Sequence, residues 1–220
     1  MEDIKGNLEK VQSTLKDGVQ LVAVTKTHPY QEINLAIDEG VTDIGENKVQ
    51  EILDKYDHVK PVRWHMIGHL QTNKVKYIVD KVSLIHSVDS LKLAKEISKR
   101  AGQHDKTMDI LLQVNAAGEE SKFGIPPEET EGLIRDILDS CPNVRICGLM
   151  CIAPFADNPE EVRPVFAAVR EQYEKFGAID HERLDFQYLS MGMSHDYQIA
   201  MEEGSNMVRV GSAIFGQRNY

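Results

Sequence analysis

The chain has 220 residues, of which 41% are hydrophobic and 27% charged, and this composition is typical of a folded globular protein rather than a disordered or fibrous one. Its formal net charge of −10 argues against a broad basic face for nucleic acid, although a local basic pocket remains compatible with it. No segment approaches the roughly 18 consecutive apolar residues of a membrane span, and residues 1–16 lack the apolar run of a secretion signal. We therefore expect one cytoplasmic domain over residues 1–220, without membrane or nucleic-acid partners.

The pattern along the chain alternates between strands and helices. Residues 1–16 have the apolar spacing of an amphipathic helix. Eight β-branched, strand-like runs follow at residues 20–25, 41–44, 62–67, 82–88, 108–114, 144–150, 184–189 and 206–210. Helical spacing of apolar residues occurs at 30–39, 47–56, 90–101, 127–140 and 160–176. Eight strands alternating with helices imply parallel pairing, and this length fits closure into a single (β/α)8 TIM-type barrel.

The three cysteines are Cys141, Cys147 and Cys151, an odd number without a C-x-x-C pair. A disulfide framework or a zinc knuckle is therefore not expected. We predict buried, reduced thiols.

Lys26 ends the first predicted strand, where a barrel presents its chemistry on the loops that follow the strands. A lysine at this position suits an amine that forms an imine with an aldehyde, provided that its surroundings favour the neutral amine. The alternative is an ordinary solvated lysine at a strand end. This segment alone does not decide between the two.

Glycine and serine follow the seventh and eighth predicted strands. Gly192 and Gly211 allow the backbone to approach an anion, and Ser190, Ser194 and Ser212 offer hydroxyl groups. Barrel enzymes commonly hold a phosphate group on these two loops. Turn and cap chemistry is the alternative, with Ser194 as the cap of a helix that begins near His195. The two loops together nevertheless favour a phosphate site.

Barrel closure would place Lys26 beside the second of these loops, because the eighth strand would then pair with the first. Arg209 would point into the same space, with a guanidinium that stays charged under ordinary conditions. An ion pair inside the barrel mouth is an equally good interpretation of Arg209. A phosphorylated aldehyde could span these groups.

Three further polar residues have less specific interpretations. His65 and His69 would suit zinc only on one helix face, but residues 64–67 have a strand pattern interrupted by Gly68, so His65 is expected to line the site or to be structural. Asn47 could reach a ligand, although a helix cap is the better default.

The chain resembles the PLP homeostasis protein family, also called YggS-like or proline synthase co-transcribed proteins, where PLP is pyridoxal 5'-phosphate. The motifs that carry the resemblance extend over nearly the whole chain. They are VTK at 24–26, GENKVQE at 45–51, HMIGHLQTNK at 65–74, KFG at 122–124, GLM at 148–150, LSMGMSHD at 189–196, VRVGS at 208–212 and IFG at 214–216.

The resemblance implies a PLP fold-type III barrel related to the cofactor domain of alanine racemase, with Lys26 as the Schiff-base lysine. It also implies that Arg209 faces the pyridine nitrogen of PLP, with phosphate contact as the alternative, and that Asn47 and His65 lie close to the cofactor. The implied phosphate site consists of Ser190, Met191, Gly192, Ser194, Gly211 and Ser212.

These expectations point to a monomeric protein that holds, buffers or delivers PLP, with PLP-dependent apoenzymes as candidate recipients, and that acts in vitamin B6 and amino-acid metabolism without a turnover reaction. We expect no β-rich domain after Tyr220 of the kind that supplies a catalytic tyrosine in the related racemases. A minimal amino-acid racemase is the enzymatic alternative if His65, His195 or Tyr197 supplies a second base. A Schiff-base aldolase for phosphorylated sugars is the third hypothesis, because it shares the lysine and the phosphate loops.

Overall fold

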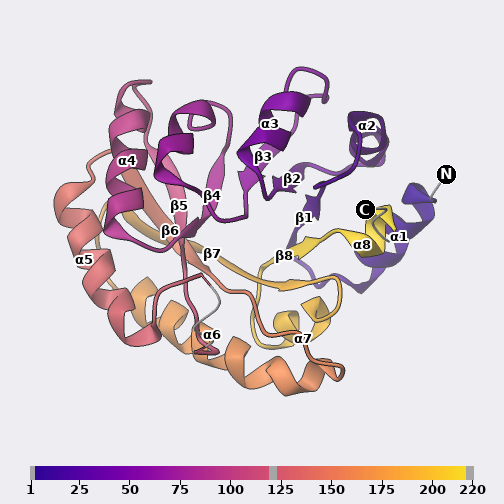
Figure 1. The fold of residues 1–220 in the computed structure, drawn as a ribbon. Coiled ribbons are helices and arrows are strands. Elements are labelled where there is room, and N and C mark those ends of the chain that lie inside the picture. The colour runs from indigo at the N-terminus through magenta and orange to yellow at the C-terminus, as the bar shows by residue number, and fades with distance from the viewer. Residues whose placement is uncertain (1–2, 119–122, 217–220) are drawn as a thin grey trace.

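Eight parallel strands form a closed barrel in the computed structural model, which describes residues 3–118 and 123–216 (Figure 1). Each strand pairs with the next, and β8 pairs with β1 to close the ring. The predicted (β/α)8 barrel is therefore confirmed. Lys122 of the KFG motif lies outside the described residues. The strands are β1 (Gln20–Val24), β2 (Asp43–Glu46), β3 (Arg63–Met66), β4 (Leu84–Val88), β5 (Met108–Gln113), β6 (Val144–Met150), β7 (Leu184–Met193) and β8 (Met207–Val210).

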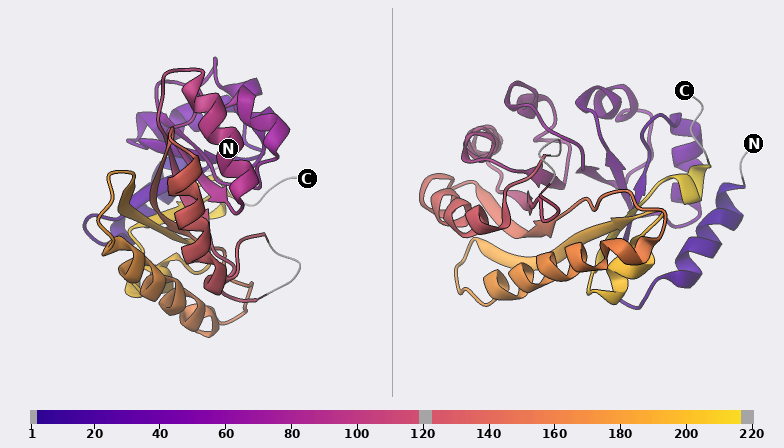
Figure 2. Two further views of the ribbon diagram at one scale, coloured as in Figure 1. Left: turned by 90° about the vertical axis from the view of Figure 1, so that its left-hand side faces the viewer. Right: turned by 60° about the horizontal axis from the view of Figure 1, so that its bottom comes forward.

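Helices surround the barrel on its outer side (Figures 1 and 2). The first helix packs beside the last, where the Asn7 side-chain amide donates to the Ile214 carbonyl over 3.1 Å. The α-helices are α1 (Ile4–Thr14), α2 (Tyr30–Asp38), α3 (Val49–Lys55), α4 (Leu91–Gly102), α5 (Thr130–Ser140), α6 (Arg163–Gly177), α7 (Tyr197–Glu202) and α8 (Ser212–Phe215). Short 3-10 helices occur at η1 (Thr72–Tyr77), η2 (Pro127–Glu129) and η3 (Pro159–Val162). No helix of the described residues is long and apolar enough to cross a membrane.

Strand β7 is longer than its β-branched run predicts. It continues through residues 190–193, because Ser190 pairs with Met207 and Met193 pairs with Arg209 after a shift in register. The prediction of a loop directly after residue 189 is therefore wrong. Ser190, Met191 and Gly192 lie in a strand, where neighbouring side chains alternate between the two faces of the sheet.

The buried hydrophobic residues form two clusters. The larger one joins the strands to the helices, and the smaller one consists of strand residues alone: Val22, Leu84, Leu111, Cys147, Met150 and Met207. All three cysteines are buried and unbridged, as predicted. Burial raises the pKa of the Cys147 and Cys151 thiols to about 12, so both remain protonated and unreactive at neutral pH.

Gly148 accommodates an irregularity between β6 and β7. The register of this strand pair shifts between Ile146 and Gly148, where the backbone of Gly148 has φ 142°. A Cβ atom at this position would lie 1.8 Å from the Tyr188 carbonyl oxygen. Only glycine fits here without displacing a neighbouring strand.

We expect Gly148→Ala to lower the free energy of unfolding by about 2 kcal/mol or more, because it adds a backbone clash to an unfavourable φ. Gly132→Ala is the matched control, since Gly132 lies in α5 and a Cβ atom added there would meet no other atom within 4 Å. The control should raise stability by about 0.5–1 kcal/mol. Urea denaturation measures both variants, and equal effects would contradict this account of Gly148.

Candidate functional site

A cavity of about 480 Å³ opens where β1, β7 and β8 end. This volume lies within the range of small-molecule sites, roughly 300–1,000 Å³. Six of the ten residues predicted for the site line it: Lys26, Asn47, Ser194, Arg209, Gly211 and Ser212. The pairing of β8 with β1 brings them together, as barrel closure predicted.

Lys26 follows β1 and is half-buried at the cavity wall. The residues on both sides of it are held by a charged cluster. Thr25 donates its hydroxyl to Glu46 over 2.7 Å, and the Thr27 amide donates to Glu51 over 2.6 Å. Thr27 has a positive φ of 68°, so a hydrogen bond at this point fixes a conformation that threonine rarely adopts.

Lys55 joins the members of this cluster. Its ammonium group donates to Glu46 over 2.7 Å, to Glu51 over 2.8 Å and to the Thr25 carbonyl over 2.9 Å. Burial raises the pKa of the Glu46 carboxyl, and the contact with Lys55 offsets part of this effect. The GENKVQE motif therefore supplies a support for the Lys26 backbone, a role that its sequence alone did not reveal.

Arg209 lies beneath the cavity and is only 3% exposed. It donates to the Ser190 hydroxyl over 2.6 Å and to the Cys151 carbonyl over 2.8 Å. Burial lowers the pKa of Arg209, but a guanidinium starts from so high a value that it stays charged. Among the described residues no carboxylate lies within ion-pair distance of Arg209, so the structure does not contain the ion pair considered from the sequence.

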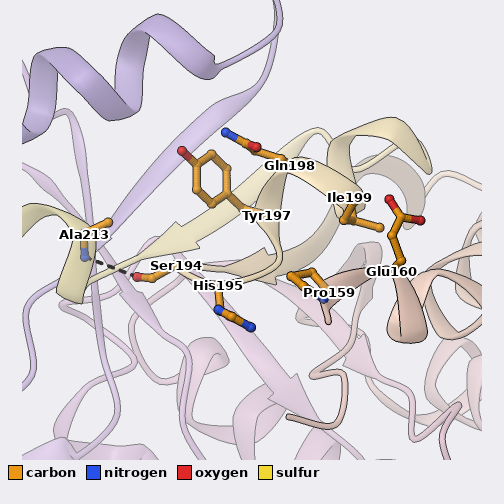
Figure 3. Close-up of a pocket in the computed structure, with 8 residues that line it drawn as sticks. All are labelled: Pro159, Glu160, Ser194, His195, Tyr197, Gln198, Ile199 and Ala213. Atoms are coloured by element: carbon orange, nitrogen blue, oxygen red, sulfur yellow. Dashed lines mark hydrogen bonds between the residues drawn. The ribbon is translucent and has the colours of Figure 1, made fainter. Parts of the chain in front are cut away.

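Ser194 connects the ends of β7 and β8 at the cavity rim, and Figure 3 shows its contact with Ala213. Its hydroxyl oxygen accepts hydrogen bonds from the Gly211 amide over 3.1 Å and from the Ala213 amide over 3.5 Å. The predicted capping role is wrong, because α7 begins at Tyr197 with Asp196 at the cap position. Since both contacts use Ser194 as an acceptor, its hydroxyl proton can be donated to a ligand.

Asn47 lines the cavity and does not cap a helix. Helix α3 begins two residues later, with Lys48 at the cap position and no side-chain cap bond. Gly68 packs tightly against the Asn47 backbone, where a Cβ atom would lie 2.3 Å from the Asn47 carbonyl oxygen. The default interpretation of Asn47 as a cap is wrong, and its position suits ligand contact.

Four predicted site residues do not line the cavity. His65 and Ser190 are buried in the barrel interior, and Met191 is fully buried in the outer core. Gly192 has φ 97° and packs against α7, where a Cβ atom would lie 2.7 Å from the Ala200 Cβ. Gly192 thus meets a requirement of packing in this structure.

Apolar side chains form much of the remaining wall, and the sequence did not single them out. Ile67 follows β3, Ile152 and Phe155 follow β6, and Met193 ends β7. Phe155 is 82% exposed and stacks on His195 with ring centroids 5.4 Å apart. Flat apolar surfaces of this kind can enclose an aromatic ligand ring.

A second cavity, of about 410 Å³, shares Ser194 and His195 with the first (Figure 3). Tyr197 lines this second cavity, and its hydroxyl lies 2.7 Å from the Thr14 hydroxyl. His195 borders both cavities, with its Nε2 atom 3.0 Å from the Ala156 carbonyl. Of the three residues considered as a second base, only His195 therefore lines the cavity that contains Lys26.

Comparison with known proteins identifies the family. Residues 1–219 match the family model for the N-terminal domain of alanine racemase. The pyridoxal phosphate homeostasis protein of Aquifex aeolicus is 45% identical over 203 residues, which cover 91% of this chain and 88% of that protein.

Solved structures agree with this result. PipY of Synechococcus elongatus, solved with PLP bound, superposes with a TM-score of 0.88 at 34% identity, covering 97% of this chain and all of PipY. Alanine racemase of Clostridium difficile shares the fold, with a TM-score of 0.77 at 14% identity over 99% of this chain and 57% of that one. The chain therefore belongs to the pyridoxal phosphate homeostasis protein family, whose barrel is that of the alanine racemase N-terminal domain.

Proposed function

We propose that this protein binds PLP covalently through Lys26 and holds, buffers or delivers it within vitamin B6 and amino-acid metabolism. The observation that carries the proposal is one cavity that combines a half-buried lysine, a buried arginine without a carboxylate partner among the described residues, and two serines at the rim. The name of the Aquifex relative and the PLP-bound structure of PipY support the same ligand.

The cavity residues fit the three chemical parts of PLP. When bound, PLP supplies an aldehyde that joins an amine with loss of water and a ring that withdraws electrons. We assign the amine to Lys26, the phosphate contacts to Ser194, Gly211 and Ser212, and the ring nitrogen to Arg209, with Asn47 beside the ring. The apolar wall would exclude water from the ring faces. In this proposal, the four predicted residues that do not line the cavity hold the lining residues in place: His65, Ser190, Met191 and Gly192.

We further propose that the protein works without a turnover reaction of its own. A permanent cation opposite the ring nitrogen disfavours its protonation, which makes the ring a poorer electron sink. Racemisation also needs an acid or base on each face of the substrate carbon. His195 is the observation that favours the alternative of a minimal racemase, although its exposed ring is stacked on Phe155 at the cavity mouth.

The partners in this proposal are PLP and the PLP-dependent apoenzymes that receive it. Ser212 and Phe155 are exposed at the cavity mouth, so the phosphate group of bound PLP would lie close to solvent. This exposure supports the transfer of PLP to another protein. We propose that the protein acts as a monomer with one domain.

The first experiment replaces the proposed attachment point. Lys26→Ala should abolish the absorption of bound PLP and the mass increase after borohydride reduction, while circular dichroism stays unchanged, because the amine is lost without a change in the core. Lys48→Ala is the control, since Lys48 lies outside the cavity. A reducible adduct that persists in Lys26→Ala would exclude this lysine as the attachment point.

The second experiment separates phosphate contacts from ring contacts. Ser194→Ala and Ser212→Ala should each weaken PLP binding by about 1.5–3 kcal/mol, because each removes a hydrogen bond to a charged group. Binding of pyridoxal, which lacks the phosphate, should change much less. Titrations followed by absorbance measure both ligands, and equal losses for the two would contradict the phosphate assignment.

The third experiment tests the absence of turnover. Amino acids should alter the spectrum of the PLP-loaded protein but exchange their α-proton with deuterated water no faster than free PLP allows, because the two-base arrangement is incomplete. Rapid exchange of alanine that depends on both Lys26 and His195 would instead support the racemase alternative. Proton NMR of the amino acid provides the measurement.

A further inference from the structure

A row of hydrogen-bonded side chains crosses the barrel interior from Arg209 to Asp43. Arg209 Nη1 lies 2.6 Å from Ser190 Oγ, and Ser190 Oγ lies 3.0 Å from His86 Nδ1. His86 Nε2 lies 2.8 Å from His65 Nδ1, and His65 Nε2 lies 2.8 Å from Asp43 Oδ1. All five side chains are buried. The row connects strands β8, β7, β4, β3 and β2.

The charged groups at the two ends determine the direction of donation. Arg209 has no acceptor atom, so it must donate to Ser190. At the other end, burial opposes ionisation of Asp43, but hydrogen bonds from His65, Arg63 and Thr42 lower its pKa to about 2. Asp43 is therefore a carboxylate at neutral pH and can only accept.

The three residues between these ends can then carry one proton in each contact. Ser190 has a single hydroxyl proton, and donating it to His86 Nδ1 leaves its lone pairs for Arg209. His86 then donates from Nε2 to His65 Nδ1, and His65 donates from Nε2 to Asp43. Burial, together with the positive charges of His65 when protonated and of Arg209, holds the pKa of His86 well below its usual range, which agrees with a neutral ring.

Donation in the opposite direction, from His65 towards Arg209, leaves the Ser190 hydroxyl proton without an acceptor in the row. It requires His86 to donate from Nδ1 to Ser190, which already accepts from Arg209. The hydroxyl proton of Ser190 would then point away from both contacts, in an interior where an unpaired polar group costs about 1–3 kcal/mol. The direction from Arg209 to Asp43 is therefore favoured.

We propose that Asp43, His65, His86 and Ser190 form a one-way relay that orients the Arg209 guanidinium beneath the cavity, with Asp43, which also pairs with Arg63, as the terminal acceptor. Hydrogen bonds aligned in one direction polarise and strengthen one another in a low-dielectric interior. These four are positioning residues, since they act on a ligand through Arg209. The effect on PLP rests on the proposed function, whereas the relay itself does not.

The first test uses the ligand-free protein. Long-range ¹H–¹⁵N NMR should show that His65 and His86 each carry a proton on Nε2 and none on Nδ1. A proton on Nδ1 of His86, or a doubly protonated His86, would overturn the relay whatever the protein does with PLP.

The second test changes the far end of the relay. Asp43→Asn removes the negative charge at the end of the row and the ion pair with Arg63, but changes no residue that lines the Lys26 cavity. It should shift the absorption of bound PLP and weaken its binding about threefold to tenfold, comparable to the loss of one hydrogen bond. Asp109→Asn is the matched control, because Asp109 lines a separate small cavity together with Asp43 and also pairs with an arginine, Arg145, but is not part of the row. The control should leave both quantities within about twofold of wild type.

A second variant protects the test against a folding defect in Asp43→Asn. Ser190→Ala separates Arg209 from the relay at the near end and should produce a spectral shift of the same kind, together with a changed ¹⁵N shift of His86 Nδ1. Borohydride reduction and mass measurement verify PLP attachment to Lys26 in every variant. Unchanged spectra and affinities in both variants, with attachment intact, would overturn the positioning role while leaving the proposed function standing. If wild-type protein fails to attach PLP, the proposed function fails, and the NMR test still decides the relay.

Discussion

The pairing of β8 with β1 closes the barrel, and the arrangement of the site depends on this contact. Val22 lies opposite Arg209 and Ala23 opposite Val210, so both strands end at the same arc of the rim. Lys26 follows β1 by two residues and Ser212 follows β8 by two residues, which brings an amine and a hydroxyl to one cavity from opposite ends of the sequence. An open sheet of the same eight strands would leave these groups on its two separate edges.

The closed barrel also contains a buried positive charge, the Arg209 guanidinium. Burying Arg209 without an adjacent carboxylate is costly unless its donors are satisfied. The Cys151 carbonyl and the Ser190 hydroxyl accept from it directly, and we infer that the histidine pair continues the row of hydrogen bonds to Asp43, which also pairs with Arg63. The cluster around Lys55 holds the backbone next to Lys26. The backbone beside the reactive amine and the guanidinium are therefore each held by polar side chains that do not themselves line the cavity.

The sequence was sufficient to predict the barrel but only part of the site. Its β-branched runs mark all eight strands, and parallel closure follows from their alternation with helices. It could not show that β7 continues to Met193, because that extension comes from pairing with β8 after a register shift. For the same reason Ser190 and Met191 were expected in a loop, although both are buried in a strand.

Single side chains were harder to place than elements. The cap assigned to Ser194 and the default cap for Asn47 rest on local spacing, whereas both residues are held by contacts with distant segments. His65 was expected either to line the site or to be structural, and its place in the interior row favours the structural interpretation. His86, Ile152 and Phe155 have no local signal at all, because their roles depend on which side of the closed barrel each residue faces.

A crystal structure of the protein grown in the presence of PLP tests the central claim most directly. The account predicts continuous density between Lys26 Nζ and the aldehyde carbon of PLP, the phosphate within hydrogen-bond distance of Ser194 and Ser212, and the Arg209 guanidinium facing the ring nitrogen. PLP attached to another lysine, or a phosphate group bound away from the ends of β7 and β8, would contradict it.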